Sequence, residues 1–115
     1  MGLREDILGF NDKQFVAFPI PEWGMEQTTV IVMDGVSRDK WEQQIYERSE
    51  NKSKRSNRGF FACLVIGDSE GNRIFKDEDA EILSQKSGIV LDRILAEGLK
   101  LNKLRAEDIE ELAKN

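Results

Sequence analysis

The sequence contains no histidine, one cysteine and two prolines among its 115 residues. The missing histidine removes the usual general base near neutral pH, the commonest metal ligand and the usual partner of a catalytic nucleophile. Any catalysis would therefore rest on carboxylates. Cys63 has no second cysteine with which to form an intrachain disulfide, and its place in the apolar run 60–66 predicts a buried thiol. A reducing compartment is expected.

Long apolar stretches are also missing. No segment approaches the roughly 20 apolar residues needed to span a bilayer, and the first residues have no apolar core of a signal peptide. We therefore expect a soluble protein. Apolar residues make up 39% of the chain and charged residues 34%, with a net charge of -5. That balance indicates a densely charged globular surface, and it disfavours non-specific binding to nucleic acid or anionic membranes.

Two β-prone runs near the N-terminus predict an antiparallel hairpin over about residues 13–34. The runs 14–20 and 28–33 flank the loop 21–26, and Pro19 and Pro21 lack the N–H that a central strand needs. The first run is therefore expected at a sheet edge. Before the hairpin, apolar spacing over residues 3–10 predicts a short helix that closes at Gly9.

Helical patterns dominate after residue 37. Ser37 is expected to be the N-cap of a helix over 38–49 whose Trp41 faces the core. The run 57–66 fits a buried helix or a strand, and a helix is favoured. Residues 67–72 predict a turn, with Ile74 and Phe75 packed inward. Further helices are predicted over 77–85 and over 106–113. Between them, a helix that ends at Asn102 or Lys103 is predicted from an apolar stripe formed by Leu91, Ile94, Leu95, Gly98 and Leu99.

These elements predict an α+β fold that is mostly α, with an N-terminal β-hairpin followed by a small bundle of four or five helices. The hairpin covers about 13–34 and the helical part about 37–114 of a single domain, 1–115. The chain carries no internal repeat and no Pro/Gly linker that would divide it.

The acidic residues do not form a convincing metal or catalytic site. A calcium loop that began at Asp68 would need glycine at its sixth position, but Gly71 is the fourth. Pairs such as Glu107 and Glu111 lie on helix faces opposite apolar stripes, which is typical of a solvated surface. We therefore expect no enzyme activity, no catalytic residues, no metal and no cofactor.

Two segments suggest binding. The stretch 48–58 carries five cations against one acid, so it fits either phosphate contacts or a charged loop that orders on a protein partner. It lacks the interleaved aromatics of a single-strand binder, which makes nucleic acid the weaker choice. At the hairpin tip, Trp23 and Met25 are either a binding anchor or a cover for the helices, and the sequence leaves both open.

The order of these pieces resembles the tail assembly chaperones of long-tailed, siphovirus-type bacteriophages and prophages. The resemblance spans nearly the whole chain and lies in the layout as a whole, since each piece alone is weak. It is carried by the hairpin tip Pro21-Glu22-Trp23-Gly24 and by residues 3–8, 38–42, 68–75, 77–79, 86–87, 91–93 and 108–115.

The resemblance implies a non-enzymatic cytoplasmic protein that binds the phage tape measure protein, helps to recruit the tail tube protein and is absent from the mature virion. Recruitment would run through a longer, frameshifted form, and the chain would be a possible homo-oligomer. The residues expected to contact a partner are large and apolar: Trp23, Met25, Phe60, Phe61, Leu91, Leu95 and Leu99. The alternatives are a structural tail or head–tail connector protein and, more remotely, a small nucleic-acid-binding regulator.

Overall fold

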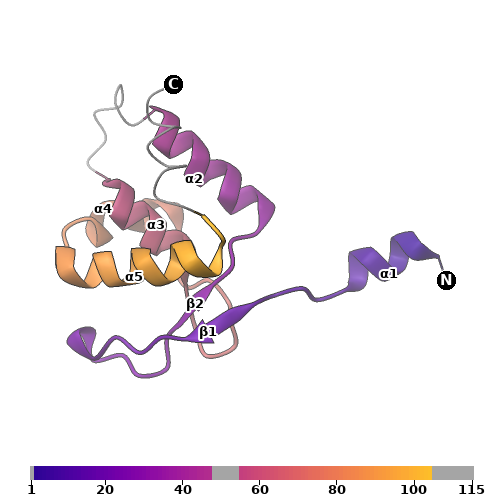
Figure 1. Cartoon of the computed structure of the whole chain (residues 1–115), viewed down its shortest axis with the longest axis horizontal. Helices are drawn as coiled ribbons and strands as arrows, with labels where there is room; N and C mark the ends of the chain where they lie inside the picture. The colour runs from indigo at the N-terminus through magenta and orange to yellow at the C-terminus, as the bar shows by residue number, and fades with distance from the viewer. Residues whose placement is uncertain (1, 48–54, 105–115) are drawn as a thin grey trace.

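The computed structural model describes residues 2–47 and 55–104, and within them helices lie over one side of a small antiparallel sheet (Figure 1). The expected mostly helical α+β class, with a hairpin before the helices, is confirmed. In chain order the elements are α1 (Leu3–Gly9), β1 (Phe15–Ala17), the 3-10 helix η1 (Pro21–Trp23), β2 (Thr29–Ile31), α2 (Gly35–Glu47), α3 (Asn57–Val65), β3 (Ile66–Gly67), the 3-10 helix η2 (Asp77–Asp79), α4 (Ala80–Leu83) and α5 (Gly88–Leu101).

The sheet has the order β1-β2-β3, and both strand pairs are antiparallel. Val30 of β2 lies opposite Val16 on one side and opposite Ile66 on the other. The first strand is at the edge, as predicted. Both strands of the hairpin are shorter than the predicted 14–20 and 28–33. At the tip end the ladder is interrupted at Pro19, which has no N–H to donate. The third strand was not predicted, since two residues that follow directly on a helix carry no period.

Helix α3 is the centre of the core. The ambiguous run 57–66 is helical up to Val65, as favoured, and Ile66 turns into the sheet. Ser56 caps the helix, because its Oγ accepts a 2.9 Å hydrogen bond from the Gly59 N–H. Every residue from 59 to 65 is buried, and Cys63 is 0% exposed, as expected. A helix that is apolar on all sides is stable only when other elements surround it.

Helix α2 covers one side of α3 through Trp41, which is 1% exposed and meets the Phe61 ring edge-on at 4.9 Å. The core position predicted for Trp41 is confirmed. The predicted N-cap at Ser37 is wrong: the helix begins at Gly35, and Ser37 lies inside its first turn. Asp34 caps the helix instead, since its Oδ1 accepts the Ser37 N–H at 2.8 Å. Residues 48 and 49 of the predicted helix lie outside the described residues.

The helix expected over 77–85 is split into η2 and α4 and ends at Leu83. Helix α5 is confirmed, and the chain turns at Asn102 and Lys103, where Lys103 has a positive φ of 57°. Leu91, Ile94 and Gly98 of the predicted stripe are buried, while Leu95 and Leu99 are partly buried. The predicted helix 106–113, with Glu107 and Glu111, lies outside the described residues, as does most of the basic stretch 48–58.

Helix α1 is the short opening helix that the sequence predicts, and it ends at Gly9. It lies apart from the other helices at the end of an extended segment (Figure 1). None of its residues is buried. Its large apolar side chains, with that of the following Phe10, are 62% to 75% exposed: Leu3, Ile7, Leu8 and Phe10.

Candidate protein-binding groove

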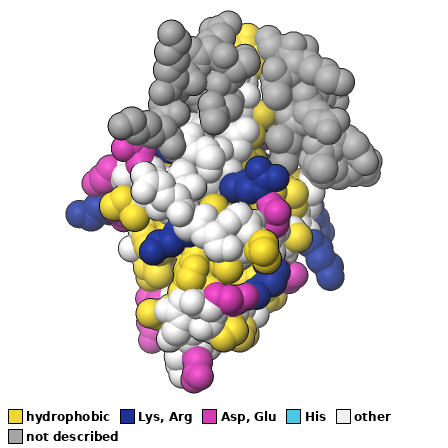
Figure 2. All heavy atoms as spheres, turned by 90° about the vertical axis from the view of Figure 1, so that its left-hand side faces the viewer, with side chains coloured by type: hydrophobic (Ala, Val, Ile, Leu, Met, Phe, Trp, Pro, Cys, Tyr) yellow, Lys and Arg dark blue, Asp and Glu magenta, His cyan; other side chains and the backbone are white. Residues whose placement is uncertain are grey.

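An apolar groove lies between the tip of the hairpin and helix α4. It encloses about 470 Å³. Hydrophobic side chains gather in the lower half of the face that Figure 2 shows, with charged side chains among them. The groove is lined by Ile20, Trp23, Met25, Thr28, Ile66, Ile74, Phe75, Asp79, Ile82, Leu83 and Lys86. Eight of these eleven residues are hydrophobic, which is the composition expected of a binding cleft rather than of a solvated surface.

The hairpin tip forms one wall of the groove. Ile20 and Met25 face each other as an isolated bridge, with the Ile20 N–H donating to the Met25 carbonyl at 2.7 Å and the Met25 N–H donating to the Ile20 carbonyl at 3.0 Å. Between them η1 reverses the chain, and Gly24 closes it with a φ of 72°, a left-handed conformation that glycine adopts without strain. The tip is therefore a built turn that presents Trp23 and Met25 in fixed positions.

Arg93 of α5 fastens this tip to the helices. Its guanidinium pairs with the Glu22 carboxylate and lies 5.4 Å from the centroid of the Phe18 ring. Two hydrogen bonds, the first from the Glu22 backbone N–H and the second from Arg93, hold the pKa of Glu22 below its ordinary value of 4.5. These contacts hold the tip against α5.

The opposite wall is formed by α4 and by the segment between β3 and η2. Ile82 is 65% exposed, Met25 is 50% exposed and Ile74 is 48% exposed, although all three line the groove. The expectation that Ile74 packs inward is therefore wrong, because its side chain borders the groove, whereas Phe75 is partly buried against the core. Leu83 and Ile20 close the floor and are buried. The rims of the groove thus keep apolar surface in contact with water.

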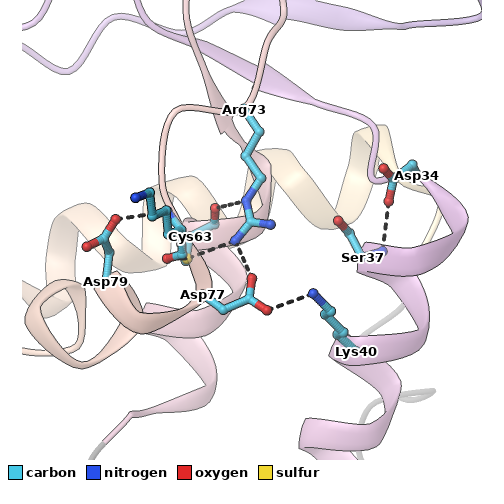
Figure 3. Close-up of polar contacts among 8 residues, drawn as sticks. Asp34, Ser37, Lys40, Cys63, Arg73, Asp77 and Asp79 are labelled. Atoms are coloured by element: carbon cyan, nitrogen blue, oxygen red, sulfur yellow. Dashed lines mark hydrogen bonds and ion pairs between the residues drawn. The ribbon is translucent and has the colours of Figure 1, made fainter.

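A polar cluster beneath this wall holds it in place (Figure 3). The Arg73 guanidinium donates to the Cys63 carbonyl at 2.9 Å and to the Asp77 carboxylate at 2.7 Å. Lys40 of α2 donates to the other carboxylate oxygen of Asp77 at 2.8 Å. These bonds join α2, α3 and η2, and they anchor both ends of the segment that carries Ile74.

The ionisable groups of this cluster have a structural role. Hydrogen bonds from Lys40 and then Arg73 lower the pKa of Asp77 from its ordinary 3.8, while burial raises the pKa of the Cys63 thiol above its ordinary 9.0. A buried thiol with a raised pKa is a poor nucleophile. Among the residues that the structure describes, no group of three or more His, Cys, Asp or Glu side chains is placed to hold a metal ion. Nor is any helix in the described part of the chain long and apolar enough to cross a membrane.

The seven residues expected to contact a partner lie in two different places. Trp23 and Met25 line the groove. Phe60, Phe61 and Leu91 are at most 2% exposed, so the protein's own core covers them, and Leu95 and Leu99 pack partly against that core. Partner binding by these residues stays a prediction. Of the seven, only Met25 is exposed, because Trp23 also packs partly against the core.

Sequence reasoning did not identify Ile82, Ile74 or the apolar face of α1 as candidate contacts. Ile82 and Leu83 are adjacent apolar residues in a predicted helix, and the sequence does not say which of them the core takes. Apolar spacing over 3–10 did indicate an amphipathic helix, but the exposure of its residues is a property of the fold. The sequence pattern therefore predicted that these residues lie in helices or pack inward, but it did not predict that their side chains are exposed.

Comparison with known proteins adds one finding. Neither a protein-family model nor a curated protein matches this sequence. A solved structure, described as the "Structure of bacteriophage HK97 tail assembly chaperone", aligns with a TM-score of 0.63 at 17% identity over 86% of this chain and 91% of that chain. At that identity the match speaks for the fold. The chain therefore has the fold of a bacteriophage tail assembly chaperone, in agreement with the resemblance that the order of its sequence segments predicted.

Proposed function

We propose that this protein is a phage tail assembly chaperone whose groove binds amphipathic helices of the tape measure protein. The observation that carries the proposal is the groove itself: an open apolar cleft with exposed walls, on a fold shared with a tail assembly chaperone. An apolar cleft between two fixed walls suits a client helix that lays one apolar stripe into it. Such a helix would place side chains three and four residues apart between Met25 on one wall and Ile82 on the other.

The exposed area of the groove sets the strength of one such contact. Met25, Ile74 and Ile82 are each roughly half to two thirds exposed, and covering them contributes about 1 to 2 kcal/mol apiece. Three such side chains give about 3 to 6 kcal/mol before the cost of association, which is of the same order. A single groove therefore binds weakly and reversibly. Tight binding follows when several copies act along one long client, because linked sites raise the effective concentration.

Weak individual contacts fit the role of a chaperone. A client that is coated by many reversible contacts stays protected from aggregation, yet it is released as the growing tail replaces those contacts. We further propose that the protein acts in the cytoplasm of the host, helps to recruit the tail tube protein through a longer form, and leaves before the virion is complete. The many charged residues elsewhere on the surface keep the protein from precipitating by itself between rounds of binding.

The test is co-purification with the tape measure protein. The tagged wild-type chain is co-expressed with that protein, and the amount recovered on the tag is compared for Trp23→Ala, Met25→Asp and a control, Tyr46→Ala. Tyr46 is an aromatic residue, 54% exposed, on helix α2 and outside the groove. We expect the two groove variants to recover several-fold less client and the control to match wild type.

Two outcomes would count against the proposal. If wild-type chain recovers no client although both proteins are present in the soluble fraction, the partner is wrong. If client is recovered equally by all four chains, the groove is wrong, because removing an anchor from a packed apolar contact lowers affinity measurably.

A further inference from the structure

The wall of the groove that α4 forms is a single helical face with charged ends. Asp79, Ile82, Leu83 and Lys86 line the groove at the spacing i, i+3, i+4 and i+7, which places them on one side of a helix. Beyond the end of α4 the chain keeps a tight helical turn, since the Lys86 N–H donates to the Leu83 carbonyl at 3.0 Å. An acid and a base therefore lie about 10 Å apart along this wall, with two apolar residues between them.

Lys86 is the cation of this wall that the described part of the fold leaves available. Its side chain is exposed, and its ammonium has no hydrogen bond or ion pair with any other residue that the structure describes. The cations beside the other parts of the groove are occupied, because Arg93 pairs with Glu22 and Arg73 pairs with Asp77. Helix α5 begins two residues after Lys86 and has no acidic residue in its first turn, so the N-terminal end of its dipole adds to the positive potential there.

The other end of the wall is acidic. Asp77, Glu78 and Asp79 form the single turn η2. Two cations offset the charge of Asp77, whereas Asp79 accepts the backbone N–H of Lys76 at 2.9 Å, a neutral partner that does not offset its charge. A carboxylate on a client helix would therefore be repelled at this end of the groove and attracted at the other.

We propose that the client helix carries an acidic side chain that pairs with Lys86 and a basic side chain, two turns along, that faces Asp79. This charge pattern rests on the proposed function, because it describes the helix that the groove takes from the client. Side chains seven residues apart on a helix are separated by about 10.5 Å along its axis, which matches the separation of the two charged ends of the wall. The apolar side chains between them would cover Ile82.

The two charged pairs set the position and the direction of the client, while the apolar contact supplies most of the affinity. A client helix shifted by one turn, about 5.4 Å, would place its carboxylate against Ile82 and an apolar side chain against Lys86. Its carboxylate and Lys86 would then lose water without gaining a partner, so the shifted complex is disfavoured. A client helix turned end for end would bring like charges together at both ends of the wall.

The exposure of Lys86 sets the size of the effect. An ion pair that stays in contact with water contributes a factor of about 2 to 5 in affinity, because solvent screens it. Reversing one charge replaces this attraction by a repulsion of similar size, so the preference for one client charge over the other is about fourfold to twentyfold. Even a fourfold preference at one groove becomes about sixtyfold when three copies hold one client, because the linked contacts multiply.

The test measures the affinity of the full chain for two synthetic helical peptides by titration calorimetry at low salt. Both peptides carry an apolar stripe with the spacing i, i+3, i+4 and i+7. The Glu/Lys peptide has glutamate and lysine seven residues apart beside the stripe, and the Lys/Lys peptide has lysine at both positions. The protein variants are Lys86→Glu and the control Lys100→Glu, since Lys100 is also an exposed lysine but lies outside the groove.

Wild type and the control are expected to bind the Glu/Lys peptide at least about fourfold more tightly than the Lys/Lys peptide. Lys86→Glu is expected to prefer the Lys/Lys peptide, because both ends of its wall are then acidic. Each preference should shrink toward equal affinity at about 0.5 M salt, since the charges are exposed.

Equal affinity of the wild-type chain for the two peptides at low salt would overturn the proposed pairing, and so would a Lys86→Glu chain that keeps the wild-type preference. If Ile82→Asp still weakens the binding of both peptides in that case, the groove binds helices without reading their charge and the proposed function stands. Binding of neither peptide, or binding that Ile82→Asp leaves unchanged, would count against the proposed function as well.

The direction of the bound helix gives a second measurement that needs no substitution in the protein. A nitroxide label at the glutamate end of the Glu/Lys peptide is expected to broaden the amide NMR signals of residues 86–90 more strongly than those of residues 77–79. The opposite pattern, or equal broadening of the two segments, would contradict pairing of the client carboxylate with Lys86.

Discussion

Asn102, at the end of α5, is expected to contribute an unusually large share of the stability for one polar residue. Its side chain is buried at 3% exposure and joins three parts of the fold. The Oδ1 accepts the Met33 N–H at 2.7 Å, and the Nδ2 donates to the Ile31 carbonyl at 3.2 Å and to the Gly98 carbonyl at 2.9 Å. This one amide thus links the end of α5 to β2 and to the segment that follows it.

The effect of Asn102→Ala follows from the backbone groups that would lose their hydrogen-bond partner. The Met33 N–H would lose its acceptor in a buried position, which costs about 2 kcal/mol, and the Ile31 carbonyl would lose a donor, at about 1 kcal/mol. The Gly98 carbonyl would still accept the Asn102 backbone N–H at 2.9 Å, so its loss of the side-chain donor adds little to the change. The free energy of unfolding should therefore fall by about 3 kcal/mol, a large fraction of the 5 to 15 kcal/mol typical of a domain.

Urea unfolding followed by circular dichroism measures this change. With a slope of about 2 kcal/mol per molar urea, the midpoint should fall by about 1.5 M. Asn102→Asp should destabilise at least as much at neutral pH, because a carboxylate accepts hydrogen bonds but donates none. The control Lys100→Ala, at an exposed position one half turn earlier, should stay within about 0.5 kcal/mol. An Asn102→Ala chain within that same margin of wild type would refute the reasoning.

Three further predictions concern packing and ionisation. Gly59→Ala should lower the free energy of unfolding by about 2 to 3 kcal/mol, because the added Cβ would lie 2.2 Å from the Ser84 Oγ and 2.7 Å from the Ser84 backbone. The control Gly88→Ala, whose added Cβ would have no atom within 4 Å, should be close to neutral in the same urea titration. Because its two cationic partners lower the pKa of Asp77, its contribution to the free energy of unfolding is fully present above pH 3.8 and is lost as the pH falls below that value. Asp77→Asn should therefore lose less stability than wild type in an acid titration over that range, and equal losses of stability would contradict this. The Cys63 thiol should react with a disulfide reagent at least about a hundredfold more slowly in the folded chain than in urea, and rapid labelling of the folded chain would show that it is not buried.

Periodicity and turn chemistry predicted most of the elements. The hairpin, the edge position of its first strand and α5 follow from alternation, proline and a helical stripe, which depend only on neighbours in the sequence. Helix α3 was favoured but ambiguous, because a run that is apolar on all sides has no period to distinguish helix from strand. The two-residue strand β3 could not be predicted, since it exists only because β2 lies beside it.

Local capping shows the same limit at single residues. Asp34 and Ser37 both lie at the start of α2, and serine and aspartate cap helices equally well. Which one caps depends on where the chain leaves the sheet, and that position is set by β2 and by the Asn102 bond to Met33. Asn102 itself was predicted only as a helix terminator, because nothing in the sequence shows that its amide reaches residues about 70 positions away.

The groove was predictable in part. An aromatic residue and a methionine at a hairpin tip suggested either a binding anchor or a cover for the helices. The structure places both in the lining of the groove, with Trp23 also packed partly against the core. Its second wall depends on which of two adjacent apolar residues of α4 turns inward, and its floor depends on packing between segments far apart in the chain. Local patterns do not contain that information.

The most direct test of binding through the groove is the affinity of the purified chain for an amphipathic segment of the tape measure protein, measured for Ile82→Asp and Val36→Asp. A charge placed in an apolar contact should raise the dissociation constant at least about tenfold, or 1.4 kcal/mol, in Ile82→Asp. Val36→Asp, equally exposed but outside the groove, should bind as wild type does. Equal affinities for the two variants would contradict the account.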